Sequence, residues 1–289
     1  MDTVMPFATR SLSPQESRVI LSMAEHGSRE IERGEIIDML GVSPQAADHV
    51  IRSLRRKGWL ERASWGQYLL IPPEMGPDAL GESNILALAS RIAEPYYFGY
   101  GTAAMHHSLT TQHRQVIRLV TPMRARNRRV LDTEVRIVNP VPGKFFGFGP
   151  VDVLGYTVMM SDREKTAIDC IDRPDLAGGE GEAATILATA CRRIDWHKAA
   201  GYLERMSSKT LTRRFGWLAE RAGANIPEDV LTHLQDLAKG SGRAFFGPRI
   251  PKPGAIGYQE GWQLTANVAS HELSDSAGIA RPRPVDRER

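Results

Sequence analysis

The clearest pattern of apolar and polar positions in this chain lies between Ser43 and Gly58. Val50, Ile51 and Leu54 recur at helical spacing and can face a core, while the positions around them are mostly polar or cationic. Ser43 can accept a hydrogen bond from an amide of the first turn, and Gly58 suits the left-handed residue that ends a helix. The pattern therefore predicts an amphipathic helix whose two ends are marked by its own sequence.

The segments around this helix complete a small unit. A capped helix is predicted from Ser11 to His26, and a shorter helix from Glu35 to Leu40 is ended by Gly41. Two strands are expected after the central helix, at Trp59 to Arg62 and at Gln67 to Ile71. Helix, short turn, helix and a two-stranded hairpin make a winged helix-turn-helix.

The rest of the chain combines strand and helix patterns. A helix from Ser83 to Ala93 is followed by alternating β-branched segments between Val116 and Met160, and a capping box of Ser161 and Glu164 opens the next helix. Further helices are expected at 182–193, 196–206, 208–222 and 228–239. The predicted fold class is α+β: a winged helix-turn-helix (1–75), a linker (76–82), a larger domain with a mixed sheet followed by several helices (83–260) and a C-terminal tail (261–289).

Composition narrows the class of protein. Of 289 residues, 42% are apolar and 25% are charged, as in ordinary globular proteins. No apolar run approaches the roughly 20 residues that cross a bilayer, and the first ten residues lack the apolar core of a secretion signal, so we expect a cytoplasmic protein with no membrane partner. Cys170 and Cys191 fit reduced packing residues, and no metal-ligand spacing occurs, so no cofactor is expected.

Charge is distributed unevenly, although its formal total is only +3. A major groove admits one helix, and side chains near the start of that helix read base edges; the candidates here are Gln45, His49 and Arg52. The candidates for phosphate contact are Ser43, Arg55, Arg56 and Lys57. The alternative is a solvated helix end favoured by the helix dipole. Because a wing follows directly, we favour contact with double-stranded DNA.

The turn between the two wing strands carries a second candidate contact. Arg62 and Trp65 could enter the minor groove there. Alternatively, Trp65 could cap the core of the unit. The sequence does not decide between these two roles.

Two more cationic sets lie in the larger domain. A loop between two strands could hold phosphates, or its charge could simply keep a hairpin soluble; its members are Arg124, Arg126, Arg128 and Arg129. The second set falls on one predicted helix and could extend the cationic surface or meet an acidic partner; its members are Lys209, Arg213, Arg214 and Arg221.

Residues suited to catalysis are few. His106, His107 and His113 lie close together, but adjacent helical residues point about 100° apart and no thiol or carboxylate arrives at ligand spacing, so one is expected to pack and one to be solvated. Asp169 and Cys170 lack a histidine base. No pair of carboxylates is placed to hold Mg²⁺ for phosphoryl transfer. We therefore predict that the protein is not an enzyme.

Two stretches of the larger domain resemble a known family. Residues 96–112 (YYFGYGTAAMHHSLTTQ) and 151–179 (VDVLGYTVMMSDREKTAIDCIDRPDLAGG) resemble the AbiEi family, antitoxins of bacterial type IV toxin-antitoxin systems that combine an N-terminal winged helix with a C-terminal antitoxin domain. Where the family often has Gly before Leu-Thr, this chain has Ser108. The resemblance implies a transcriptional autorepressor that binds repeated half-sites in its own promoter and neutralises a nucleotidyltransferase-like toxin, directly or indirectly.

The sequence thus favours a sequence-specific DNA-binding repressor and antitoxin. The alternative, from a different class, is a protein-interaction module whose winged helix and basic surface bind a protein partner such as the toxin. A mobility shift of the upstream promoter fragment is expected in the first case only.

Overall fold

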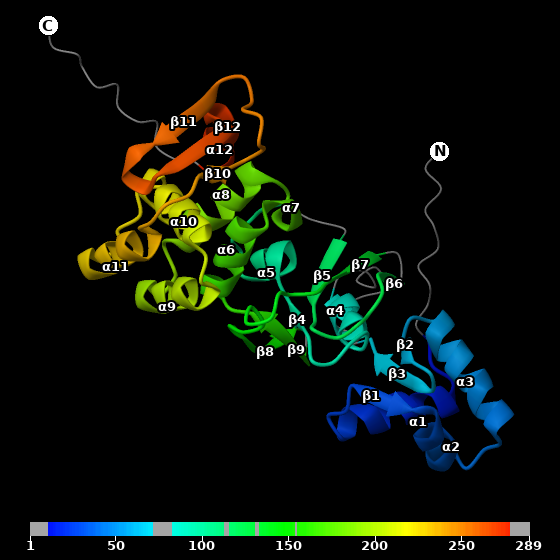
Figure 1. Cartoon of the computed structure of the whole chain (residues 1–289). Coiled ribbons are helices and arrows are strands. Elements are labelled where there is room, and N and C mark those ends of the chain that lie inside the picture. The colour runs from blue at the N-terminus through cyan, green and yellow to red at the C-terminus, as the bar shows by residue number, and fades with distance from the viewer. Residues whose placement is uncertain (1–10, 72–82, 113–115, 131–132, 154, 278–289) are drawn as a thin grey trace, which may run out of the picture. The chain divides into compact units, whose positions relative to one another are not determined.

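The computed structural model describes residues 11–71, 83–112, 116–130, 133–153 and 155–277 (Figure 1). The expected linker at 76–82 lies outside them. The chain divides into two units: the first comprises Met1–Glu94, Arg129–Thr133 and Pro150–Val158, and the second comprises the remaining residues. The fold class is α+β, as predicted, with a winged helix-turn-helix near the N-terminus and a mixed sheet and several helices after it.

Three helices build the winged helix-turn-helix: α1 (Pro14–Glu25), α2 (Arg33–Leu40) and α3 (Pro44–Arg56). α1 opens with a capping box in which the side chains and amides of Ser13 and Glu16 bond reciprocally. α2 ends at Gly41, which has the left-handed φ of 64°. The Ser43 hydroxyl caps α3, and Gly58 follows that helix with φ 71°. The predicted cap at Ser43 and the left-handed glycines at 41 and 58 are confirmed.

A three-stranded antiparallel sheet completes this unit, in the order β1-β3-β2: β1 (Glu30–Glu32), β2 (Leu60–Ser64) and β3 (Gln67–Leu70). The wing strands β2 and β3 were predicted to within two residues. Strand β1 was not predicted, because three residues with one buried side chain, Ile31, are too short to show a period of two.

Strand β3 is covered on both faces. Tyr68 and Leu70 pack in the core formed with α1, α2 and α3. Leu69 points the other way and packs with Leu88 of α4 (Ser83–Ser90) and with Tyr156, whose hydroxyl donates to the Leu70 carbonyl at 2.6 Å. A strand buried on both faces needs a continuous apolar run, as β3 has. The wing therefore offers a partner its tip rather than its flat faces.

The mixed sheet predicted for the larger domain is present, in the order β6-β7-β5-β4-β9-β8. β4 pairs antiparallel with β5 and parallel with β9, and β5 pairs parallel with β7. The strands are β4 (Tyr97–Phe98), β5 (Val116–Val120), β6 (Arg128–Val130), β7 (Thr133–Val138), β8 (Phe148–Val153) and β9 (Tyr156–Ser161), and α5 (Tyr100–His106) follows β4. The β-branched segments were therefore interpreted correctly as strands.

A group of helices follows the sheet: α6 (Arg163–Asp172), α7 (Pro174–Ala177), α8 (Glu180–Ala190), α9 (Trp196–Met206), α10 (Lys209–Arg221) and α11 (Glu228–Ala238). Most were predicted within two residues of their bounds. The capping box at Ser161 was wrong by one residue: Asp162 caps α6 by accepting from the Lys165 amide at 2.8 Å. Glu164 accepts instead from the Asp195 amide at 2.9 Å, which ties α6 to the start of α9.

A second small sheet was missed. β10 (Ala244–Phe246), β12 (Leu264–Ala269) and β11 (Ala255–Gln259) lie in that order, with η2 (Glu260–Trp262) and α12 (Ser270–Ala277) beside them. Trp262 is buried against α10, where a Cβ on Gly216 would lie 2.1 Å from the indole. The predicted tail from residue 261 is thus wrong as far as residue 277, because Leu264 and Leu273 are core residues.

Candidate nucleic-acid interface

The outer face of α3 carries most of the predicted DNA contacts. Val50, Ile51 and Leu54 are buried, as the spacing predicted. The side chains on the opposite face are exposed: Ser43, Gln45, His49, Arg52, Arg55 and Arg56. The structure therefore brings the candidate base-reading and phosphate-binding residues together on one helix face, with the polar members near its start and the cationic members toward its end.

Two cations at the end of this helix already have carboxylate partners. Lys57 donates to Glu16 of α1 at 2.6 Å, and Arg55 lies 3.5 Å from Glu61 of β2. Burial alone would raise the pKa of the Glu16 carboxyl, but hydrogen bonds from Lys57 and from the residue 13 amide outweigh burial and lower that pKa from 4.5 to about 2. Lys57 thus ties α1 to α3, a role that sequence reasoning missed.

Arg52 and Arg56 differ from these two residues. Within the described part of the chain neither is in an ion pair. The nearby acid Asp48 is bound to Arg33 of α2 at 2.7 Å, and this hydrogen bond lowers the pKa of Asp48. The charges of Arg52 and Arg56 are consequently available to an anionic ligand.

The wing tip presents an unusual aromatic side chain. Trp65 is 90% exposed, so the alternative that it caps the core is wrong. The Arg62 guanidinium lies over its ring, 5.1 Å from the centroid, within the range of a cation–π contact. The tryptophan that packs in the core of this unit is Trp59, which is 9% exposed.

The predicted loop of arginines connects β5 to the edge strand β6. Arg124 and Arg126 lie in this loop, whereas Arg128 and Arg129 lie on β6 itself, and all four side chains are exposed. Asn139 fixes the start of the loop by donating to the carbonyls of Thr121 and Met123 at 2.8 and 2.9 Å. Arginines on an edge strand also hinder pairing with other chains, so both roles weighed from the sequence remain compatible with this geometry.

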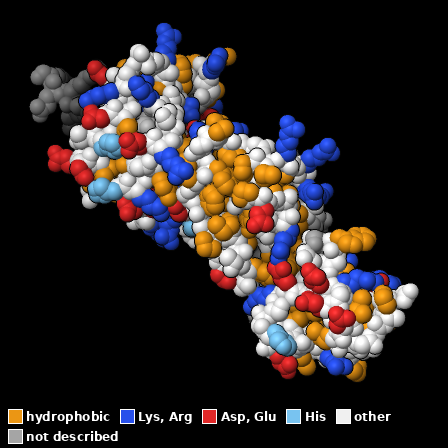
Figure 2. All heavy atoms as spheres, turned by 60° about the horizontal axis from the view of Figure 1, so that its bottom comes forward, with side chains coloured by type: hydrophobic (Ala, Val, Ile, Leu, Met, Phe, Trp, Pro, Cys, Tyr) orange, Lys and Arg blue, Asp and Glu red, His pale blue; other side chains and the backbone are white. Residues whose placement is uncertain are grey.

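The predicted cationic set on α10 does not form an exposed surface. Arg213 is 2% exposed and donates to the carbonyls of Ala238, Gly240 and Gly242 and to the side chain of Gln263. Arg214 and Arg221 donate to the Phe245 carbonyl and the Ser270 hydroxyl, leaving Lys209 as the exposed member. The suggestion that this set meets DNA or an acidic partner is corrected: its arginines hold α11 and the second sheet. On the face of the molecule seen in Figure 2, the Lys and Arg side chains lie in several separate places rather than in one continuous patch.

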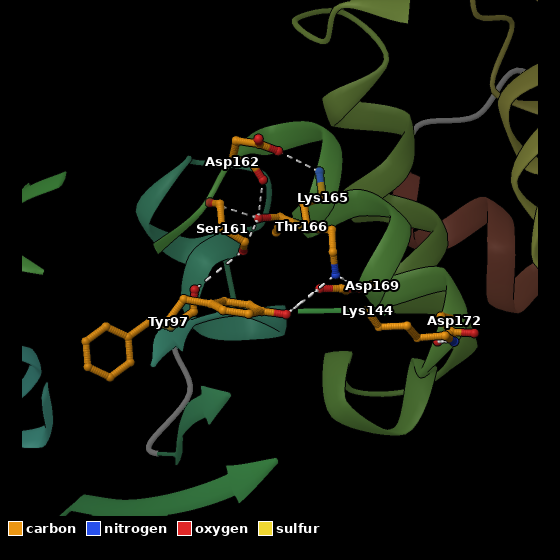
Figure 3. Close-up of polar contacts among 9 residues, drawn as sticks. Tyr97, Lys144, Ser161, Asp162, Lys165, Thr166, Asp169 and Asp172 are labelled. Atoms are coloured by element: carbon orange, nitrogen blue, oxygen red, sulfur yellow. Dashed lines mark hydrogen bonds and ion pairs between the residues drawn. The ribbon is translucent and has the colours of Figure 1, made fainter. Parts of the chain in front are cut away.

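The two stretches that carry the family resemblance meet in a buried polar network (Figure 3). Tyr97 of β4 donates to Asp169 of α6 at 3.4 Å, and the Lys165 ammonium lies 2.5 Å from the same carboxylate. Burial raises the pKa of Asp169, while the Lys165 charge opposes that rise. His107, which caps the end of α5, bonds the carbonyl of Ser161 at the end of β9 at 2.7 Å. These residues hold β4 to α6 and the end of α5 to β9, so in this chain they are a framework rather than a surface.

The described residues contain no group of three or more His, Cys, Asp or Glu side chains placed to hold a metal ion. His106 is exposed and His107 is packed, as expected, whereas His113 lies outside the described residues. Burial raises the pKa of the Cys191 thiol to about 12, which disfavours the nucleophilic thiolate.

Together these features define a class: a winged helix-turn-helix whose helix α3 has an exposed, partly cationic outer face, in one chain with a larger α+β unit. The crystal structure of the RV2827C protein from Mycobacterium tuberculosis has a similar fold, with a TM-score of 0.62 and 18% sequence identity over 93% of this chain and 97% of that one. No family model matches the chain, and no curated protein matches it. None of the described helices is both long and apolar enough to span a membrane.

Proposed function

We propose that the protein is a sequence-specific DNA-binding transcriptional repressor. The observation that carries the proposal is the outer face of α3, where Arg52 and Arg56 project without a carboxylate partner among the described residues and Gln45 and His49 lie nearer the helix start. This order suits a helix that reads base edges with its first turns and meets phosphates further along.

Repression would follow from occupancy. A protein bound across its own promoter excludes polymerase, and no catalytic step is needed. The arginines of the β5–β6 loop would add phosphate contacts, since each neutralised phosphate releases a counterion and strengthens binding at low salt. Repeated half-sites would place two copies of the chain on one promoter.

The antitoxin role is a second part of the proposal and rests on the resemblance to the AbiEi family. Residues that carry this resemblance form the polar network that joins β4 to α6 and the end of α5 to β9. That placement fits the framework of an antitoxin domain, whose contacts with a toxin would lie elsewhere on its surface. The partner would be a nucleotidyltransferase-like toxin encoded next to this gene.

One observation favours the alternative of a protein-interaction module. Tryptophan and arginine are enriched among the residues that dominate the energy of protein interfaces, and the wing tip pairs Arg62 with a highly exposed Trp65. In that case the winged helix would dock on a protein, with DNA binding incidental.

A mobility shift separates the two functions. The full chain is titrated onto the promoter fragment upstream of its gene at moderate salt, with a scrambled fragment of the same length as control. The repressor proposal predicts retardation of the promoter fragment well before the scrambled one. Equal retardation of both fragments, or of neither, would contradict it. Co-expression with the adjacent gene product then tests the antitoxin part by growth rescue.

A further inference from the structure

The turn that carries Trp65 is held rigidly. Gly66, the next residue, has a φ of 76° that an L side chain rarely adopts, and its carbonyl accepts from the Arg33 amide at the start of α2 at 2.8 Å. The Gln67 side chain donates to the Glu32 carboxylate at 3.2 Å. The exposed indole is therefore presented by a braced turn rather than by a loose loop.

The wing tip shares a side of the sheet with α3. In the antiparallel pairing of β2 with β3, Arg62 lies opposite Tyr68, so both side chains project from the same face. Tyr68 packs in the core that contains Val50 and Leu54 of α3. Arg62, and the indole beneath its guanidinium, consequently extend from the side on which α3 lies.

A partner for this tip must accept both a flat apolar ring and positive charge. Burying Trp65 removes a large apolar surface from water, and the Arg62 guanidinium over the ring adds a positive charge beside it. Duplex DNA meets both demands: its minor groove has a strongly negative potential, and apolar side chains act there as wedges between base steps.

We infer that the Arg62 and Trp65 pair is a second DNA-reading element, in which the indole wedges against a base step of the minor groove. This inference rests on the proposed function and adds to it. A wedge unstacks a step, and pyrimidine–purine steps unstack at the lowest cost. The pair therefore selects a deformable step beside the bases read by α3, and the bound DNA is bent there.

The test compares Trp65→Ala and Trp65→Phe with Leu21→Ala on the promoter fragment. Leu21 lies on α1 and is 60% exposed, so its variant removes an exposed apolar side chain away from the tip. Affinity is measured by fluorescence anisotropy at several salt concentrations, and bending by energy transfer between the labelled ends of the fragment.

We expect Trp65→Ala to weaken promoter binding about tenfold or more, because stacking of an aromatic side chain on a base contributes on that scale. Its salt slope should stay that of the wild type, since no charge is lost, and the bend should decrease. Trp65→Phe should retain most of the affinity and the bend. Leu21→Ala should match the wild type, and thermal unfolding should show all three variants folded.

Three results would overturn the inference, and they are distinguishable. If the wild type binds the promoter and Trp65→Ala binds it equally well with the same bend, the inference that the indole wedges at a base step is wrong. The repressor proposal then stands. If the wild type does not retard the promoter at all, both fail. Loss of capture of the adjacent gene product by Trp65→Ala, with DNA binding intact, would assign the tip to a protein partner instead.

Discussion

Two helices of this protein carry arginines in similar sequence contexts, and the structure uses them in opposite ways. On α3, Arg52 and Arg56 project from the outer face and are exposed. On α10, Arg213 is buried and donates to three carbonyls and one side-chain oxygen. A guanidinium has five donors and stays charged in either place, so the residue type alone does not reveal which role it has.

The difference comes from what each helix packs against. α3 packs its apolar stripe in the core, and its outer face, with Gln45, His49, Arg52 and Arg56, is exposed. α10 lies among helices and the second sheet (Figure 1), and it meets the end of α11, where helix carbonyls lack amide partners. The carbonyls of Ala238, Gly240 and Gly242 find their donor in Arg213. A basic helix thus indicates a nucleic-acid surface only once its burial is known.

The largest expected effect is at Arg213. Replacing it with alanine takes the donors from the buried Ala238 carbonyl and from the carbonyls of Gly240 and Gly242, and should lower the free energy of unfolding by about 3 to 5 kcal/mol, as for the loss of several bonds to a charged group. Urea denaturation measures this. Lys209→Ala removes an exposed cation from the first turn of the same helix and should change stability by less than about 0.5 kcal/mol. Equal stability of both variants would contradict the stabilising role of the bonds that Arg213 donates.

The next largest expected effect is the contribution of the Glu16 and Lys57 pair to the free energy of unfolding, which depends on pH. The folded pKa of Glu16 is about 2 against an ordinary 4.5, so the pair stabilises the fold fully above pH 4.5 and this contribution is lost as the pH falls toward 2. At neutral pH the contribution is at most about 3 kcal/mol.

Urea denaturation of the wild type and Glu16→Gln between pH 2 and pH 7 checks this. The difference in unfolding free energy between them should shrink as the solution is acidified. Glu25→Gln at the end of the same helix, where the carboxylate is exposed, is the matched control. A difference that does not depend on pH would show that Glu16 acts through packing rather than through its charge.

The smallest expected effect is on how well the protein discriminates between DNA sequences. Gln45→Ala on the outer face of α3 should reduce discrimination between the promoter and a single-base variant of it by roughly 1 to 3 kcal/mol, while binding to unrelated DNA changes little. Competition titrations with both fragments measure the ratio. Gln15→Ala, at the exposed start of α1, serves as the control. An unchanged ratio would remove Gln45 from the base-reading set.

Local signals predicted the elements that local chemistry determines. Ser13, Ser43, Gly41 and Gly58 mark their helix ends through bonds and backbone angles that involve only a few neighbouring residues. The exposed face of α3 followed from its apolar stripe in the same way. The missed N-cap at Asp162 shows the limit of such signals, because two adjacent residues could both cap and the choice depends on what Glu164 meets in α9.

Elements built by long-range pairing were not predictable in this way. β10 pairs in parallel with β12, which lies 20 residues further along the chain, in a segment whose glycines and prolines are typical of loops. The partners of Arg213 lie at positions 238 to 263, and that of Lys57 lies at position 16. No spacing within a helix reports such contacts, and they decide which cations remain for a ligand.

Salt dependence tests most directly whether the outer face of α3 binds DNA. The promoter fragment is titrated with the wild type, with Arg52→Ala/Arg56→Ala and with Arg18→Ala/Lys209→Ala, a control that removes the same charge from exposed positions elsewhere. The slope of log K against log salt is negative, and its magnitude should decrease by about 2 for the α3 variant. The slope of the control should equal that of the wild type. Equal slopes and affinities for all three proteins would contradict the account.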